Sequence, residues 1–126
     1  MSASAARSFF VVATVLTAAL GLGWLVAPAF MLDQWGVPDA DAATVYMSRR
    51  YAVMFFGYTT LLWLARQHTG TPAGRAICAG GTVVTGVMAL LSLQGVLSGV
   101  VGPFAWSAVV AETLLATFFS RCWARA

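Results

Sequence analysis

The chain has 126 residues, of which 60% are hydrophobic and only 9% are charged. Soluble domains carry about 25% charged residues, so a chain of this length cannot hide its apolar surface from water, and we expect lipid to cover part of it. All seven cations are arginine, and the absence of lysine excludes Schiff-base chemistry on lysine and a P-loop phosphate site. The net charge of +3 does not indicate nucleic-acid binding, because the arginines stand at the ends of apolar runs rather than in a basic patch.

A first apolar run covers residues 8–27 and is closed by Pro28. A helix of this length is about 30 Å long, which matches the hydrocarbon core of a bilayer. Arg7 in front of the run is also compatible with a secretory signal peptide, but hydrophobic regions of signal peptides are only about 7–15 residues long. The sequence therefore predicts a retained membrane helix, with a cleaved signal peptide as the alternative.

An interfacial link of residues 28–45 follows. The proline at its start and Gly36 frame a short turn of helix, whose apolar side chains suit the surface of a membrane. Asp39 is predicted to be the N-cap of the next helix, with Asp41 in its first turn, where the helix dipole favours a negative charge.

The second membrane helix is predicted over residues 46–66. Its uncharged part is too short to span a bilayer, so Arg49 and Arg50 must lie inside its outer turns. Neighbours on a helix point about 100° apart, so we expect one arginine to face the bundle and the other to reach the lipid headgroups. Tyr51 suits anchoring at the membrane surface, whereas Tyr58 lies deeper and needs a hydrogen-bond partner.

The third and fourth membrane helices are predicted over residues 74–97 and 103–121. Thr71 caps the third helix, and a proline follows at its first position. All five tryptophans of the chain fall near predicted helix ends, which is the pattern of the aromatic belt at membrane surfaces. The sequence therefore predicts a single all-α domain over residues 1–126, an integral membrane four-helix bundle.

With four crossings, the two termini and the middle connection lie on the same side of the membrane. That side carries five arginines and the other side two, so the positive-inside rule predicts that both termini are cytoplasmic. We expect a multi-pass protein of the bacterial inner membrane. Cys78 and Cys122 would then lie near the cytoplasmic face, where thiols stay reduced, so no structural disulfide is predicted.

Glu112 is the only charged residue between Gly102 and Ser120. An ionisable residue is costly inside a bilayer and marks a candidate interior site. Its neighbours on the same helix face include three alanines, so we expect the carboxyl group to point into the bundle or at another chain. Arg49 or Arg50 is its charged partner within reach. The alternatives are a protonated, neutral carboxyl group that hydrogen-bonds a neighbouring helix, a proton or cation site on a transport path, and a contact with a partner subunit.

Small residues recur at helical spacing in the first, third and fourth helices, as close helix packing in lipid requires. The predicted packing faces are at Thr17, Gly21, Thr82, Gly86, Ala108 and Ala116. The third helix carries a stripe of small and polar residues at Cys78, Thr82, Thr85, Gly86, Ala89 and Ser92. Packing is the preferred interpretation of this stripe, and a ligand groove is the alternative.

The sequence offers no catalytic or metal-binding arrangement. Its single histidine, His68, lies in a polar connection, and neither cysteine has a histidine at metal-ligand spacing. The membrane segments hold neither a nucleophile motif nor a pair of carboxylates. We therefore expect no enzyme activity, no metal and no cofactor.

The layout resembles the DoxX-like group of small bacterial four-helix membrane proteins. The resemblance is carried by the proline-closed end of the first helix (residues 21–28), by the link PAFMLDQWGV and by the second helix RRYAVMFFGYTTLLWLAR. It implies a four-helix bundle and no specific activity.

These observations predict a non-catalytic membrane protein without nucleic-acid partners. The preferred function is a structural or accessory subunit, embedded in the lipid bilayer and packed against other membrane subunits or against copies of itself. The alternative is a carrier or binder of a small or lipophilic molecule that uses Glu112 as an intramembrane proton or cation site.

Overall fold

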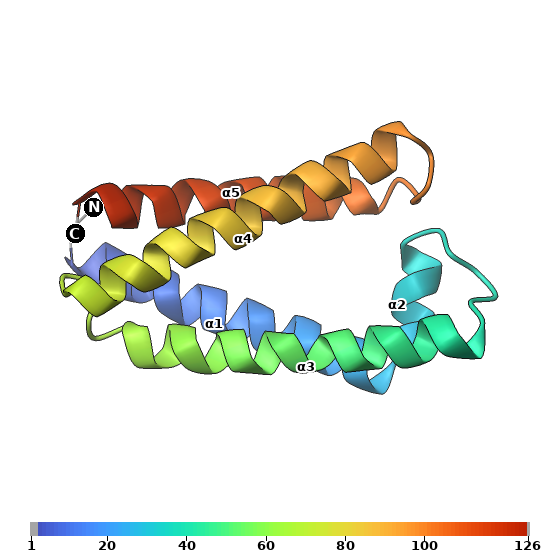
Figure 1. Cartoon of the computed structure of the whole chain (residues 1–126), viewed down its shortest axis with the longest axis horizontal. Coiled ribbons are helices and arrows are strands. Elements are labelled where there is room, and N and C mark those ends of the chain that lie inside the picture. The colour runs from blue at the N-terminus through green and yellow to red at the C-terminus, as the bar shows by residue number, and fades with distance from the viewer. Residues whose placement is uncertain (1–2, 126) are drawn as a thin grey trace.

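The computed structural model describes residues 3–125 and contains five helices and no strand in that part of the chain, which confirms the all-helical class. The helices are α1 (Ala3–Val26), α2 (Pro28–Gln34), α3 (Ala42–Ala65), α4 (Pro72–Leu97) and α5 (Ala105–Arg125). The long helices pair as two antiparallel hairpins, α1 with α3 and α4 with α5 (Figure 1). The short helix α2 lies across the turn of the first hairpin.

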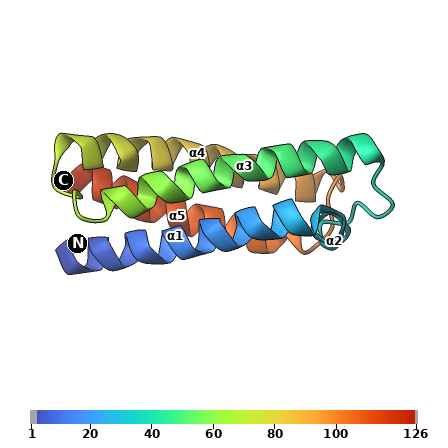
Figure 2. The same cartoon turned by 90° about the horizontal axis from the view of Figure 1, so that it is seen from below.

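The two hairpins converge at the end that holds both termini and the α3–α4 connection, and they diverge towards α2 (Figures 1 and 2). The hydrophobic core lies at the convergent end. Its buried members come from all four long helices and are Phe10, Ala13, Leu62, Ala65, Cys78, Phe119 and Cys122. Aromatic edges join the hairpins there, since the ring of Phe119 meets Phe9 at 4.9 Å and Phe10 at 6.0 Å.

A second contact joins the hairpins at the divergent end. The Gly102 amide, in the α4–α5 connection, donates a hydrogen bond of 2.6 Å to the carbonyl oxygen of Trp35. Gly36 has a φ of +80°, and a Cβ atom placed on it would lie 2.7 Å from the Gly102 nitrogen. The two connections therefore meet backbone to backbone, which requires glycine at this position.

Replacing Gly36 with alanine is expected to separate these two connections. Gly99 is a matched control, because its φ of +71° is equally unfavourable for alanine but no atom lies within 4 Å of its Cβ position. We expect Gly36→Ala to lower the free energy of unfolding by about 0.5–1.5 kcal/mol more than Gly99→Ala, the usual contribution of one hydrogen bond. Equal losses in detergent unfolding curves would show that the contact does not stabilise the fold.

The helices extend beyond the predicted boundaries at several ends. α1 begins before residue 8, because the alanine-rich start favours helix. α5 begins two residues after Pro103, which forms a turn with Phe104, and continues past residue 121. α3 begins at Ala42, so the link is shorter than residues 28–45.

The N-cap of α3 is Asp41 and not Asp39, contrary to the prediction. Asp39 has a φ of 56° and forms part of a turn, whereas the Asp41 carboxylate accepts a hydrogen bond of 2.7 Å from the Thr44 amide. Hydrogen bonding from the Thr44 side chain, and then from its backbone, lowers the pKa of Asp41. The cap is therefore complete above the ordinary aspartate pKa and is lost as the pH falls through the lowered value.

Two of the helices are long and apolar enough to cross a membrane. They are α1 from Ser4 onward and α4, with mean hydropathies of 2.2 and 1.9 over their most apolar windows. Large apolar side chains are exposed on all four long helices, including Val15, Met54, Leu90 and Leu114. The apolar surface of the chain is thus turned outward over much of its length.

Candidate functional site

The Glu112 carboxylate, on α5, accepts a hydrogen bond of 2.8 Å from the Ser92 hydroxyl, on α4. Ser92 is buried and Glu112 is half-buried. The hydrogen bond joins the two helices of one hairpin. The hydrogen-bond partner of Glu112 is therefore a hydroxyl group of a neighbouring helix, which is one of the predicted alternatives.

Arg49 and Arg50 do not approach Glu112. Both are exposed on α3, and within residues 3–125 neither makes a hydrogen bond or an ion pair. The structure therefore differs from the expectation that one of the two arginines faces the bundle, and Glu112 has no cationic partner in the described part of the chain.

Glu112 lies on the face of α5 that carries Phe119. It precedes Phe119 by about two helical turns, so the two side chains point to the same side of α5. Phe119 contacts the Phe9 ring of α1 at 4.9 Å and the Tyr58 ring of α3 at 6.3 Å. The carboxylate is thus directed at the seam between the hairpins, two turns away from the aromatic core.

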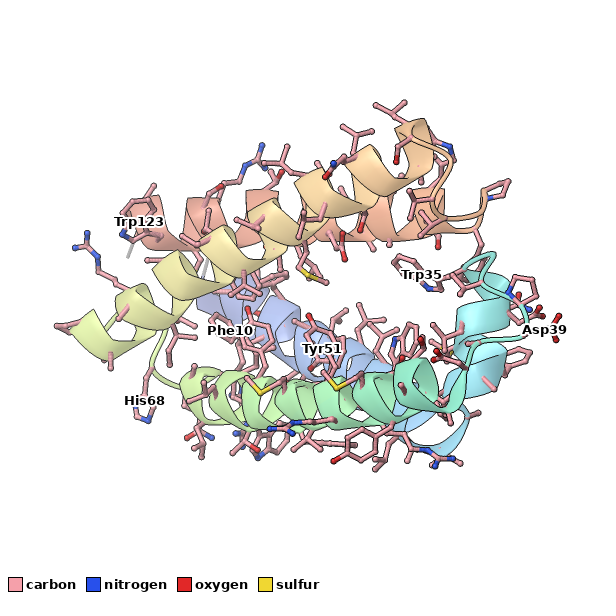
Figure 3. All side chains as sticks on the ribbon, turned by 45° about the vertical axis from the view of Figure 1, so that its right-hand side comes forward. Phe10, Trp35, Asp39, Tyr51, His68 and Trp123 are labelled. Carbon is pink, nitrogen blue, oxygen red and sulfur yellow. The ribbon has the colours of Figure 1, made fainter. Side chains whose placement is uncertain are left out.

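Tyr51 occupies the matching position on α3, which runs parallel to α5 (Figure 1). It precedes Tyr58 by about two turns, and its hydroxyl donates to the Met88 sulfur of α4 at 3.6 Å. In Figure 3, the labelled side chains of Phe10, Trp35 and Tyr51 lie between the two hairpins. Met88 lies one turn before Ser92 on α4. We call the four residues Tyr51, Met88, Ser92 and Glu112 the polar layer.

The seam is closed two turns nearer the termini. A Cβ atom on Gly81 would lie 2.8 Å from ring carbons of Phe119 and 2.8 Å from the Tyr58 hydroxyl oxygen, so these residues fill the space between the hairpins. The Tyr58 hydroxyl is buried and has no hydrogen-bond partner among the described residues, although buried hydroxyl groups usually have one. The polar layer is more open, because 52% of Tyr51 is exposed.

The predicted packing positions on α1 lie in the contact between α1 and α3. The hydroxyls of Thr17 and Thr59 are 2.7 Å apart and form a hydrogen bond across this contact. A Cβ atom on Gly21 would lie 2.9 Å from Cβ of Phe55, so the small residue allows the helices to approach closely.

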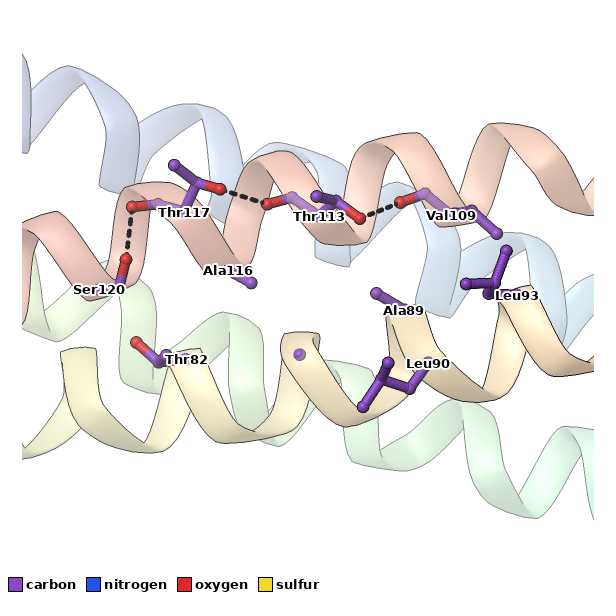
Figure 4. Close-up of a pocket in the computed structure, with 10 residues that line it drawn as sticks. Thr82, Ala89, Leu90, Leu93, Val109, Thr113, Ala116, Thr117 and Ser120 are labelled. Atoms are coloured by element: carbon purple, nitrogen blue, oxygen red, sulfur yellow. Dashed lines mark hydrogen bonds between the residues drawn. The ribbon is translucent and has the colours of Figure 1, made fainter.

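Three other predicted packing positions, Thr82, Gly86 and Ala116, line a shallow groove of about 390 Å³ between α4 and α5 (Figure 4). The groove also contains three hydroxyl side chains of α5, those of Thr113, Thr117 and Ser120, and each donates to a carbonyl of its own helix, at 2.7–2.9 Å. Their hydrogen-bonding needs are therefore met within the helix. Ala108, the last predicted packing position, is half-buried on α5 and does not line the groove.

Cys78 and Cys122 are free thiols in the hydrophobic core. In residues 3–125, no three side chains of histidine, cysteine, aspartate or glutamate gather where they could hold a metal ion. Among the described residues of the hairpin seam, the polar layer holds a carboxyl group, two hydroxyl groups and a thioether, joined in pairs by two hydrogen bonds.

Comparison with known proteins adds no relative. No protein-family model matches the chain, and neither curated proteins nor solved structures show significant similarity to it.

Proposed function

We propose that the chain is an integral membrane protein that crosses the bilayer four times, through α1, α3, α4 and α5, with α2 at the membrane surface and a layout related to the DoxX-like group. The exposed apolar side chains on all four long helices support this proposal, since they would otherwise face water. Both termini and the α3–α4 connection lie at one end of the structure (Figure 1). Five of the seven arginines belong to that end, which favours its location in the cytoplasm of a bacterial cell.

Within the membrane, the proposed function is that of an accessory subunit which packs against other membrane subunits. The groove between α4 and α5 carries this proposal. Seven of its ten lining residues are glycine, alanine, serine or threonine, and its α5 hydroxyl groups donate within their own helix. Surfaces rich in small residues allow another membrane helix to approach closely.

Replacing Gly86 with leucine is expected to fill the groove and to release the partner. No atom lies within 4 Å of the Cβ position of Gly86 or of Gly80, but only Gly86 lines the groove. Gly80→Leu on the same helix is therefore the matched control. The measurement is purification in a mild detergent followed by native mass spectrometry.

We expect the wild type and Gly80→Leu to be purified with a partner, and Gly86→Leu to be purified alone. A partner that is another copy of this chain would identify the groove as a homo-oligomer contact. A wild-type protein that is always recovered alone would contradict the accessory role, and a partner retained by Gly86→Leu would contradict the role of the groove.

The polar layer favours a second candidate function, the binding of a small lipophilic molecule between the hairpins. Glu112 is half-buried there and has no cationic partner among the described residues. The Tyr51–Met88 pair lies one turn away along α4. Ionisable groups within membrane-spanning helices commonly mark binding or transport sites.

A further inference from the structure

We propose that the polar layer binds the ammonium group of a lipophilic amine, with Glu112 as its counter-ion. This inference rests on the second candidate function, because it names the chemical class of the molecule held between the hairpins. It follows from the hydrogen bonds, the charge and the aromatic lining of the polar layer.

The hydroxyl donors of the polar layer are already used. The Ser92 hydroxyl donates to Glu112, and the Tyr51 hydroxyl donates to Met88. The groups that remain are acceptors, namely the lone pairs of the carboxylate, of the tyrosine oxygen and of the thioether. A ligand that fits this layer must therefore donate hydrogen bonds, as an ammonium group does and a quinone or a ketone does not.

An ionised Glu112 would have no matching charge in the polar layer. One neutral hydroxyl is its hydrogen-bond partner, and among the described residues it has no ion pair. A carboxylate in apolar surroundings is costly unless a cation or several donors accompany it. A ligand cation would supply the missing charge.

The lining of the layer suits an organic cation. The rings of Tyr51 and Phe55 meet edge to face at 5.8 Å, and Tyr51 remains 52% exposed. Aromatic faces attract alkylammonium groups, and a thioether adapts to the adjoining alkyl carbon atoms. The hydrophobic core lies about two helical turns nearer the termini, so it does not cover this lining.

The test uses the purified full-length chain in nanodiscs of phosphatidylglycerol, a lipid without an amine, and two small probes in equilibrium dialysis at neutral pH. The probes are 1-aminoadamantane, which is cationic, and 1-adamantanol, its neutral analogue with the same cage. Empty nanodiscs correct for partition into the lipid. We expect saturable one-to-one binding of the amine, and binding of the alcohol that is weaker by about tenfold or more.

Glu112→Gln removes the charge but keeps the shape of the side chain, and it should weaken amine binding by about tenfold or more. Asp33→Asn is the matched control, because it removes an exposed carboxylate on α2 and should leave binding unchanged. A second pair of variants, both at Tyr51, tests the aromatic lining. These variants also keep the proposal testable if Glu112→Gln does not fold. Tyr51→Leu should weaken amine binding, whereas Tyr51→Phe keeps the ring and should largely retain it.

An ammonium group can come from a dissolved amine or from a lipid headgroup, and nanodiscs of phosphatidylethanolamine distinguish these sources. Loss of the difference between wild type and Glu112→Gln in these nanodiscs identifies the headgroup as the occupant, and an unchanged difference identifies a dissolved amine. Comparing the two proteins within one lipid cancels the different surface charges of the two lipids. Equal saturable binding of amine and alcohol that Glu112→Gln does not change would overturn the ammonium proposal and leave a lipophilic binding site. Absence of saturable binding of both probes would overturn the second candidate function as well.

Discussion

Replacing Phe119 with alanine is expected to lower the free energy of unfolding by about 3–5 kcal/mol, the usual cost of truncating a buried phenylalanine. Phe119 is fully buried, and its ring contacts Phe9 and Phe10 on α1 and Tyr58 on α3. It therefore joins α5 to both helices of the other hairpin. Truncation leaves a cavity where the hairpins converge, which adds to the lost burial of the ring.

The neighbouring residue provides the control. Phe118 is 41% exposed and makes one stacked contact, with Phe9 at 5.0 Å. Phe118→Ala should therefore cost only about 0.5–1.5 kcal/mol, the contribution of one aromatic pair. The measurement is equilibrium unfolding in mixed micelles, followed by helical circular dichroism. Similar losses for the two variants would show that the convergent core does not hold the hairpins together.

Replacing Gly81 with leucine is expected to cost about 3 kcal/mol or more, because the new side chain enters a space that is already filled. The Cβ position itself is 2.8 Å from Phe119 ring carbons and from the Tyr58 hydroxyl oxygen. The Phe119 ring carbons cannot move away unless the whole ring leaves the core. We expect the two hairpins to separate at this point.

Gly80→Leu differs from Gly81→Leu by one position on the same helix. Gly80 is exposed and has no atom within 4 Å of its Cβ position. Leucine is a better helix former than glycine, so this variant should be neutral or should gain up to about 1 kcal/mol. Equal destabilisation of the two variants in the same unfolding experiment would contradict the close packing of the seam at Gly81.

The helices could be predicted from the sequence because their signals are local. Pro28 and Pro72 mark helix starts, and Gly99 stands in a turn. The apolar runs before and after these residues are about as long as a membrane helix. The four long helices and the short helix after Pro28 follow from this punctuation. The N-cap of α3 was assigned to the wrong aspartate, because Asp39 and Asp41 are both good capping residues and only the backbone conformation distinguishes them.

The arrangement of the hairpins could not be predicted in this way. The contact between Gly36 and Gly102 joins two connections that are far apart in the sequence, and no local pattern encodes it. Helix crossing angles depend on side-chain packing over the whole contact. The alternation of apolar runs and turns therefore predicts which consecutive helices form a hairpin. It does not predict how the two hairpins pack against each other.

The surroundings of Glu112 were predicted only in part. Its helix face was expected to point into the bundle or at another chain, and it shares that face with the core residue Phe119. Among the described residues, Arg49 and Arg50 make no ion pair with Glu112. Tyr51 donates to Met88 across the seam, and Arg50 and Arg49 are turned about 100° and 200° away from Tyr51 on the helix. Ser92 belonged to the predicted stripe of small and polar residues. Tyr51 was assigned to the membrane surface, although its spacing of two turns from Tyr58 was a signal that both face the seam.

The measurement that tests the account most directly is the accessibility of single cysteines from the two sides of the membrane. One cysteine replaces Asp39, in the connection near α2, and the other replaces Gln67, in the α3–α4 connection at the end with the termini. Both are made in a variant with Cys78 and Cys122 replaced by serine. With four crossings, a membrane-impermeant maleimide labels position 39 in intact spheroplasts and labels position 67 only after permeabilisation. Labelling of both positions in intact spheroplasts would mean that α3 does not cross the membrane, which would contradict the account.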